Sequence, residues 1–199
     1  MSRRVIAYDF DGTITNVDTF PAFIHFAIGG WKFYTTFILF APLLILMKLK
    51  LSSADKTKER IFSFVFKGVQ YSTFTEWCQT FAKNNKEILR PKAMQSIAKF
   101  QQEKDTTLYI VSAGIKEWIT PFFEDNQFTA IIATEIEVDG DGKLTGRFKS
   151  KNCNRSEKVS RLLQVEPNRS EYELIVFGDS SGDKDIIEFA EVGYYNKFV

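Results

Sequence analysis

The chain has 199 residues, of which 44% are hydrophobic, and its formal net charge is +1 at pH 7. The length suits one core domain with an insertion, and the hydrophobic share is sufficient for a sizeable core, which excludes global disorder. The near-neutral charge gives no electrostatic basis for a nucleic-acid partner. Cys78 and Cys153 lie far apart and lack the spacing of a zinc site, so we expect neither a disulfide scaffold nor a zinc centre, and a reduced, cytoplasmic setting.

The first predicted element is a strand that ends in two acidic residues. Arg4 to Tyr8 (RVIAY) form an apolar run typical of a buried strand, and Asp9 to Thr13 (DFDGT) follow it directly. Ligands bind at the carboxyl ends of strands in open α/β sheets, and residues two apart in a strand point to the same side. Asp9 and Asp11 are therefore expected to share a small space, where a hard cation such as Mg²⁺ would relieve their repulsion. Because residues 1–11 already carry this strand and site, they are not expected to be a signal peptide.

Two acidic stretches resemble part of a calcium-binding EF-hand loop. Such a loop needs flanking helices and a Glu at position twelve. A strand precedes the Asp9–Asp11 pair, and Asp18 stands at position twelve. The second stretch, Asp139 to Gly142 (DGDG), puts Phe148 at that position. We expect no EF-hand at either place, and a hairpin turn at 139–142.

A helical insertion is predicted after the first strand. Residues from about 15 to 90 contain several helical stretches without a strong strand signal and interrupt the βα alternation. Lys92 to Lys104 is then predicted as a helix that leads into the second strand. The predicted organisation is an α/β core formed by residues 1–14 and 91–199, with a helical cap at 15–90.

The cap contains an uncharged apolar segment, Phe33 to Met47, with Lys32 before it and Lys48 after it. A helix over this segment is about 22 Å long, short of the ~30 Å hydrocarbon core of a membrane. Pro42 is expected to kink or break such a helix. Three interpretations remain open: a buried cap helix or helical pair, which is favoured, an interfacial or re-entrant membrane segment, and a transmembrane span.

Two further strand ends carry polar residues of related chemistry. The run at 107–111 stops at Ser112, and the run at 174–177 stops at Gly178 and Asp179, with Asp183 four residues on. Between them, Lys158 stands at the start of a predicted helix. Each has an ordinary explanation as a helix cap, a turn residue or a surface charge. Together they describe a phosphate-ester site with a nucleophile, metal carboxylates, a hydroxyl donor and a fixed cation.

The single histidine, His25, lies in an apolar stretch outside these motifs. We expect it to pack within the cap, which makes Ser-His-Asp hydrolysis improbable.

In order and spacing, the motifs resemble those of the haloacid dehalogenase (HAD) superfamily of phosphohydrolases, over about residues 4–195. The match to subfamily IB, which includes phosphoserine-phosphatase-like enzymes, lies in Asp18-Thr19-Phe20, Phe66-Lys67-Gly68, Ile110-Val111-Ser112-Ala113, Leu144-Thr145-Gly146, and Asn152-Cys153 with Lys158. This resemblance implies a three-layer, Rossmann-like core with a parallel sheet and a helical type C1 cap inserted after the first strand.

The resemblance also implies the catalytic roles. Asp9 would attack phosphorus and form an aspartyl-phosphate, while Asp11 would act as general acid and then as general base. Ser112 and backbone N–H groups near Ala113 would bind phosphate oxygens, and Lys158 would offset the negative charge.

The implied cofactor is Mg²⁺. Its ligands would be the Asp9 carboxylate, the Asp11 carbonyl and Asp179. Asp183 would orient the waters bound to the metal. Thr13 would fix the geometry of the loop through its hydroxyl.

The expected function is therefore Mg²⁺-dependent hydrolysis of a phosphomonoester, with the substrate left open. One alternative is a lipid phosphate, because the apolar cap resembles that of C-type phosphatidylglycerophosphatases in Phe23-Ile24-His25-Phe26, the run through Ala41-Pro42-Leu43, and Phe66-Lys67-Gly68. That alternative places residues 33–47 in contact with the inner face of the membrane, in an otherwise cytoplasmic protein. Phosphoserine is the second alternative. It is less favoured because Asp18 stands where those enzymes carry Glu, and because residues 178–183 read GDSSGD.

Two other classes are less well supported by the sequence. Receiver-type phosphoacceptor domains combine similar residues, but their acceptor Asp ends a middle strand and they lack a cap of this size. A phosphomutase has no specific support in the sequence.

Overall fold

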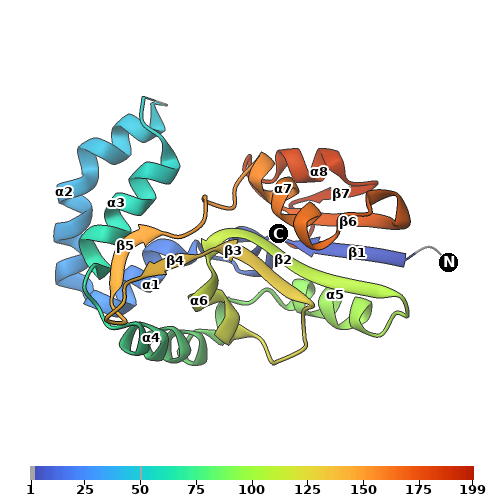
Figure 1. Ribbon diagram of the computed structural model, residues 1–199, viewed down its shortest axis with the longest axis horizontal. Helices are drawn as coiled ribbons and strands as arrows, with labels where there is room; N and C mark the ends of the chain where they lie inside the picture. The colour runs from blue at the N-terminus through green and yellow to red at the C-terminus, as the bar shows by residue number, and fades with distance from the viewer. Residues whose placement is uncertain (1–2, 50) are drawn as a thin grey trace.

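The computed structural model describes residues 3–49 and 51–199, which form an α/β core and a helical insertion (Figure 1). The core sheet is parallel and five-stranded, in the order β3-β2-β1-β6-β7. Its strands are β1 (Arg3–Tyr8), β2 (Thr106–Ile115), β3 (Ala130–Thr134), β6 (Tyr172–Gly178) and β7 (Val192–Tyr195). The expected α/β fold with a parallel sheet and a helical insertion after the first strand is confirmed.

Helices cover both faces of this sheet, which explains why its central strand is buried from Val5 to Tyr8. On one face, Ile6 and Tyr8 of β1 pack in a cluster with residues of α5 (Pro91–Gln101). On the other, Val5 and Ala7 pack with α7 (Ser156–Val165) and α8 (Lys184–Phe189). Figure 1 shows the resulting three layers, with α5 on one side of the sheet and α7 and α8 on the other.

The register of the strands sets the position of the candidate site. Tyr8, the last residue of β1, is paired with Ile110 on β2 and with Phe177 on β6. The residues that follow these positions in the three strands therefore emerge together at the carboxyl edge of the sheet.

The described residues of the insertion between β1 and α5 form four α-helices with a core rich in phenylalanine. They are α1 (Thr19–Ile28), α2 (Gly30–Lys48), α3 (Ala54–Phe66) and α4 (Tyr71–Asn84). Phe23 of α1 packs against Phe66 and Phe74, with ring centroids 5.8 and 5.5 Å apart, respectively. Short helical turns occupy Phe10–Ile14, Lys86–Ile88, Lys116–Ile119 (α6), Thr120–Phe122 and Arg169–Glu171.

A β-hairpin packs on the insertion. The strands β4 (Ile136–Val138) and β5 (Leu144–Phe148) are antiparallel, so the expected turn at 139–142 is confirmed. The Phe148 N–H donates to Glu59 Oε1 of α3 at 2.9 Å. Gly146 has a φ of +82°, and a Cβ there would lie 2.9 Å from the Ser63 Cα, so only glycine allows this close approach of β5 to α3. The domain boundaries expected from the sequence remain a prediction.

Helix α2 contains the apolar segment, and the structure differs from expectation there in two ways. The helix continues through Pro42 without a break. Among its described residues only Thr36 is buried, so the favoured interpretation as a buried cap helix is wrong. By length and composition alone, α2 could cross a membrane.

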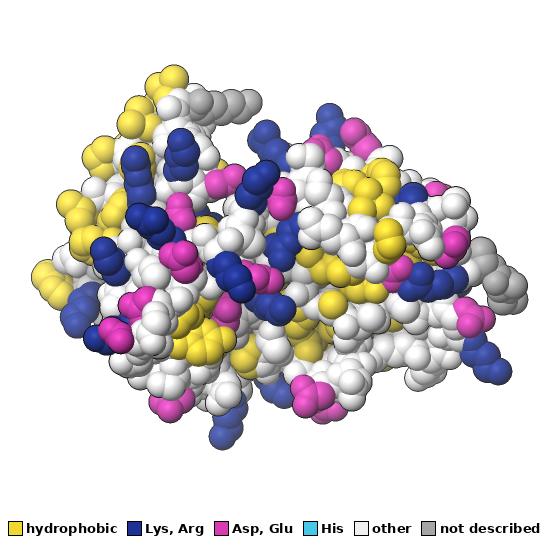
Figure 2. All heavy atoms as spheres, in the orientation of Figure 1, with side chains coloured by type: hydrophobic (Ala, Val, Ile, Leu, Met, Phe, Trp, Pro, Cys, Tyr) yellow, Lys and Arg dark blue, Asp and Glu magenta, His cyan; other side chains and the backbone are white. Residues whose placement is uncertain are grey.

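Five of the exposed large apolar side chains of α2, counting Leu49 directly after it, are spaced by three, four or seven residues and so share one side of the helix. We call this set the outer face of α2: Trp31, Tyr34, Ile38, Ile45 and Leu49. Figure 2 shows hydrophobic side chains gathered along the edge of the molecule where α2 lies in Figure 1. Phe33, Phe37, Phe40 and Leu44 instead pack against the cap core.

Candidate active site

The carboxyl ends of β1, β2 and β6 bring the motif residues into one region, as the sequence predicts. Asp9 follows β1, Ser112 lies in β2, and Asp179 follows β6. Lys158 lies in the first turn of α7, and Asp183 immediately precedes α8. A cavity of about 650 Å³ is lined by several of these residues, namely Asp9, Asp11, Ser112, Ala113, Lys158 and Asp179.

The centre of the site is a buried ion-pair triad. Lys158 Nζ donates to Asp9 Oδ1 at 2.7 Å and to Asp183 Oδ1 at 2.5 Å, and all three side chains are buried. Burial lowers the pKa of Lys158, but the two carboxylates outweigh this, so its pKa is raised overall. Burial raises the pKa of Asp183, but the Lys158 ammonium outweighs it and the net direction is downward. Lys158 is therefore a fixed cation beside Asp9.

Asp9 itself is strongly desolvated. Burial raises its pKa to about 7, although the Lys158 ammonium opposes this shift. Nearby cations stabilise the charged form of a buried carboxylate, and Lys158 is one such cation beside Asp9.

Asp11 lies in the irregular turn after Asp9, where the chain leaves the sheet for the cap. Its Oδ1 accepts from the Thr19 N–H at 2.9 Å and from Thr19 Oγ1 at 2.6 Å, which holds the side chain at the start of α1. Burial raises the pKa of Asp11 to about 6, and the nearby Asp18 adds to this rise. A carboxyl group with such a pKa can serve as a proton donor near neutral pH.

Gly12 and Thr13 position Asp179. Thr13 Oγ1 donates to Asp179 Oδ1 at 3.2 Å, so the hydroxyl expected to fix the loop reaches across to the third acidic residue. Gly12 has a φ of +77°, and its missing side chain leaves room for the same carboxylate. The turn after β1 and the turn after β6 therefore pack directly against each other.

The sequence predicted that the second strand stops at Ser112. In the structure β2 continues to Ile115, so Ser112 lies within the strand. The pairing of β2 with β3 shifts register between Val111 and Ile115, which marks an irregularity at this place. Ser112 Oγ accepts from the Gly114 N–H at 3.0 Å. Such irregularities change the direction of side chains at the ends of sheets, and here Ser112 and Ala113 line the cavity.

Three carboxylates could hold a metal ion. Asp9, Asp179 and Asp183 each offer an oxygen within 4.8 Å of the others. Asp183 already accepts from Lys158 through Oδ1 and from the N–H groups of Asp179 and Ser180 through Oδ2. Asp9 and Asp179 are thus the more available donors, and an all-oxygen set of this kind fits a hard cation such as Mg²⁺.

The structure adds cavity residues that the sequence analysis did not select. Phe37, Leu44 and Met47 of α2 give the cavity an apolar wall, and Lys58 of α3 adds a second cation. Lys58 shares the cavity-lining face of α3 with Ala54 and Ile61, at helical spacing. That spacing was the available signal, because charged and apolar residues on one helix face can point into one cavity.

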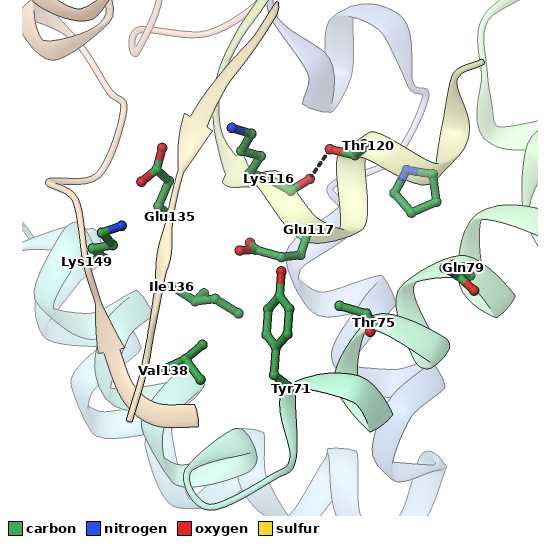
Figure 3. Close-up of a pocket in the computed structure, with 11 residues that line it drawn as sticks. Tyr71, Thr75, Gln79, Lys116, Glu117, Thr120, Glu135, Ile136, Val138 and Lys149 are labelled. Carbon is green, nitrogen blue, oxygen red and sulfur yellow. Dashed lines mark hydrogen bonds between the residues drawn. The ribbon is translucent and has the colours of Figure 1, made fainter. Parts of the chain in front are cut away.

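A second cavity, of about 490 Å³, lies away from the motifs (Figure 3). In Figure 3 the Tyr71 hydroxyl points toward the carboxylate of Glu117. Among the described residues, Glu117 Oε2 has no hydrogen-bond partner although it is buried. Burial raises the pKa of Glu117 to about 7.

Comparisons with known proteins agree with this fold. Protein CicA of Caulobacter vibrioides is 28% identical over 196 residues, which cover 98% of this chain and 86% of CicA. A crystal structure of a protein of unknown function from Bordetella pertussis Tohama I has a TM-score of 0.81 at 18% identity, covering 96% of this chain and 88% of that one. A phosphoserine phosphohydrolase-like protein from Francisella tularensis has a TM-score of 0.69 at 16% identity, covering 96% and 85%, so the fold is close to that of phosphoserine-phosphatase-like structures. The profile of the haloacid dehalogenase-like hydrolases matches residues 6–188, and the chain belongs to that family.

Proposed function

We propose that this protein is a Mg²⁺-dependent phosphomonoester hydrolase that works through an aspartyl-phosphate on Asp9. The observation that carries the proposal is the 2.7 Å contact between Lys158 Nζ and Asp9 Oδ1 at the carboxyl end of β1. This contact fixes one oxygen of the carboxylate and leaves the other for attack. Ser112 and Ala113 line the same cavity and supply polar groups for the phosphate oxygens.

In the first step, an Asp9 oxygen forms a bond to phosphorus as the ester P–O bond breaks. Asp11 gives its proton to the departing alcohol oxygen, which its raised pKa favours. In the second step, the Asp11 carboxylate takes a proton from a water molecule whose oxygen attacks phosphorus. The bond between Asp9 and phosphorus breaks, inorganic phosphate leaves, and both carboxyl groups return to their starting states.

Mg²⁺ would be held by Asp9, Asp179 and the Asp11 carbonyl, and when bound it neutralises charge on the phosphoryl group. Asp183 acts as a positioning residue because both of its oxygens are already engaged. Lys158 stays a cation throughout, since two carboxylates stabilise its charge.

The test is to trap the phosphoenzyme. Wild-type protein mixed with p-nitrophenyl phosphate and quenched in acid should carry one phosphate on Asp9, located by mass spectrometry of peptides. Asp9→Asn should fold, and it should neither turn over substrate nor carry the label. A label on Ser112, or turnover without any phosphoenzyme, would overturn the assignment.

One observation favours a second, narrower candidate, a phosphatase of lipid phosphates at a membrane surface. Phe37, Leu44 and Met47 place apolar side chains of α2 in the same cavity as Asp9. An apolar wall beside the phosphate site suits a substrate with a hydrocarbon portion better than the zwitterion phosphoserine.

The opposite side of α2 supports the same candidate. Its outer face is exposed and apolar, and no Asp or Glu occurs between Thr19 and Ala54, whereas Lys32 and Lys48 lie near the two ends of the helix. Apolar area with flanking cations and an exposed Trp and Tyr is typical of helices that lie in the interface of anionic membranes. This candidate makes the protein cytoplasmic and peripheral to the inner face of the membrane.

A further inference from the structure

Lys58 is a cation at the catalytic cavity that none of the catalytic steps uses. It projects from α3 of the insertion, and its Nζ donates to the Ala113 carbonyl, one residue after Ser112, at 2.5 Å. The ammonium also lies over the Phe20 ring, 5.3 Å from its centroid. The side chain thus spans from the insertion to the phosphate-binding edge of the core.

The charge of Lys58 is poorly matched by its surroundings. An ammonium group has three donors, and the Ala113 oxygen is the one hydrogen-bond acceptor found for it in residues 3–49 and 51–199. Within the same residues it forms no ion pair, whereas Lys158 has two. Burial lowers the pKa of Lys58, and the carboxylates of Asp11, Asp18 and Asp55 oppose that shift in this order.

Each of those neighbouring carboxylates already has one oxygen in a hydrogen bond with another residue. Asp11 Oδ1 accepts from Thr19, Asp18 Oδ1 accepts from the Phe20 N–H at 2.9 Å, and Asp55 Oδ1 accepts from Asn152 Nδ2 at 2.5 Å. Lys58 is partly buried at the cavity wall. A partly buried cation without a paired anion is stabilised when a ligand brings the anion.

The position of Lys58 indicates which part of a ligand it would meet. Lys158 and Asp9 mark the place of the transferred phosphoryl group. Asp11, which protonates the leaving oxygen in the proposed mechanism, lines the same cavity as Lys58. Thr19 holds Asp11, and the next residue, Phe20, lies under the Lys58 ammonium. Lys58 therefore lies on the side of the leaving group.

We propose that Lys58 is a specificity-determining residue that binds a second anionic group, a carboxylate or a phosphodiester, on the leaving group of the substrate. The inference rests on the proposed phosphatase function. It narrows the substrate class to phosphomonoesters that carry another negative charge a few atoms from the ester oxygen. When such a substrate binds, the Lys58 ammonium donates to its second anion, either in place of the Ala113 carbonyl or in addition to it.

The experiment compares three phosphate esters on one propyl skeleton. Propyl phosphate has no second anion, 3-phosphooxypropanoate has a carboxylate, and the 3-(methyl phosphate) of propanediol 1-phosphate has a phosphodiester. We expect wild-type kcat/KM to be at least 10-fold higher for one or both anionic esters. A hydrogen bond to a charged group accounts for a factor on the order of 10 to 100.

Lys58→Met keeps the length of the side chain and removes its charge. It should abolish the preference, mainly through a higher KM, and change kcat/KM for propyl phosphate less than 3-fold. Lys58→Arg should retain a large part of the preference. The matched control is Lys56→Met, an exposed lysine on the same helix, which should behave as wild type.

Two outcomes would overturn the inference: a wild-type enzyme that hydrolyses all three esters equally well, or an equal loss on all three esters in Lys58→Met. The second would mean that Lys58 only connects the insertion to the core.

Calorimetric binding of the same esters to Asp9→Asn gives an independent measurement. The anionic esters should bind more weakly when Lys58→Met is added to that variant. If wild type hydrolyses neither these esters nor p-nitrophenyl phosphate, the proposed phosphatase function itself fails, a result that is distinct from loss of the Lys58 preference.

Discussion

Gly12 and Asp179 approach each other so closely that a methyl group on Gly12 would lie 2.2 Å from Asp179 Oδ2. The two residues belong to turns that follow different strands, β1 and β6, and they meet only because those strands are neighbours in the sheet. The position of Asp179, a proposed metal ligand, therefore depends on the absence of a side chain at Gly12, which is far away in the sequence.

Replacing Gly12 with Ala should displace Asp179 and weaken metal binding. We expect the Mg²⁺ concentration needed for half-maximal activity to rise at least 10-fold, with a loss of stability of about 1–2 kcal/mol from the positive φ. Gly68→Ala is the control, because Gly68 also has a positive φ, of +83°, but an added Cβ there would meet no atom within 4 Å. It should lose similar stability and keep the wild-type response to Mg²⁺; a normal Mg²⁺ response in Gly12→Ala would contradict the assignment of Asp179.

The all-oxygen cluster of Asp9, Asp179 and Asp183 predicts a requirement for Mg²⁺. Activity on p-nitrophenyl phosphate should disappear in EDTA and return when Mg²⁺ is added in excess. Ca²⁺ should compete without supporting turnover, because its longer bonds and looser coordination disturb the alignment of the reacting atoms. Activity that persists after exhaustive chelation would exclude a metal-dependent mechanism.

Loss of Lys158 should destabilise the fold as well as stop catalysis. Lys158→Met leaves Asp9 and Asp183 as two buried carboxylates without their cation, a change that costs about 3–5 kcal/mol in comparable sites. Urea unfolding measures this difference. Lys184→Met is the control, since its ion pair with Glu188 is 3.6 Å long and exposed, and such pairs contribute about 0–1 kcal/mol. Equal effects of the two substitutions would show that the triad adds no stability.

The raised pKa of Glu117 predicts that the free energy of unfolding depends on pH. Its pKa in the folded protein is about 7, against an ordinary value of 4.5, so folding favours the protonated form. Its contribution to stability is complete below pH 4.5 and is lost as the pH rises through 7. Glu117→Gln cannot ionise and should become more stable than wild type across this range, by up to about 3 kcal/mol above pH 7.

Thermal melts of both proteins from pH 4.5 to 8 measure the difference, and Glu124→Gln, at an exposed position, serves as control. A constant difference in melting temperature between Glu117→Gln and wild type would refute the prediction. Activity should change little, because Glu117 lines the second cavity and not the catalytic one.

If the protein acts on lipid phosphates as proposed, the two faces of α2 predict separable effects on vesicle binding and on lipid hydrolysis. Replacing Ile38, Ile45 and Leu49 with Ser alters only the exposed outer face. This variant should lose co-sedimentation with vesicles of anionic phospholipid and hydrolysis of lipid phosphates in them. It should keep its melting temperature and its turnover of p-nitrophenyl phosphate.

The matched variant carries Phe37→Ser and Leu44→Ser, on the side of α2 that lines the cavity. It should still bind vesicles, yet hydrolyse lipid phosphates poorly because the apolar wall is gone. Wild-type protein that stays entirely in the supernatant and prefers soluble phosphates would remove the lipid candidate and leave the general phosphatase function standing.

Local features of the sequence were sufficient to predict the fold and to select the motif residues. A buried parallel strand needs a continuous apolar run, so RVIAY before Asp9 and LIVF before Gly178 predicted strands from a few residues each. The carboxyl ends of such strands meet at one edge, so the acidic residues that follow them were expected together. The hairpin at 139–142 likewise depends on a local turn.

Other properties were decided only by the tertiary structure, because they depend on contacts between distant segments. Asp183 became a partner of Lys158 through the packing of α7 against α8, and Lys58 met Ala113 because the insertion folds back over β2. The exposure of α2 could not be predicted from its composition, since a uniformly apolar run has no polar side to distinguish solvent from core. The sequence by itself determined the chemistry at the strand ends, and the packing of the insertion determined what surrounds it.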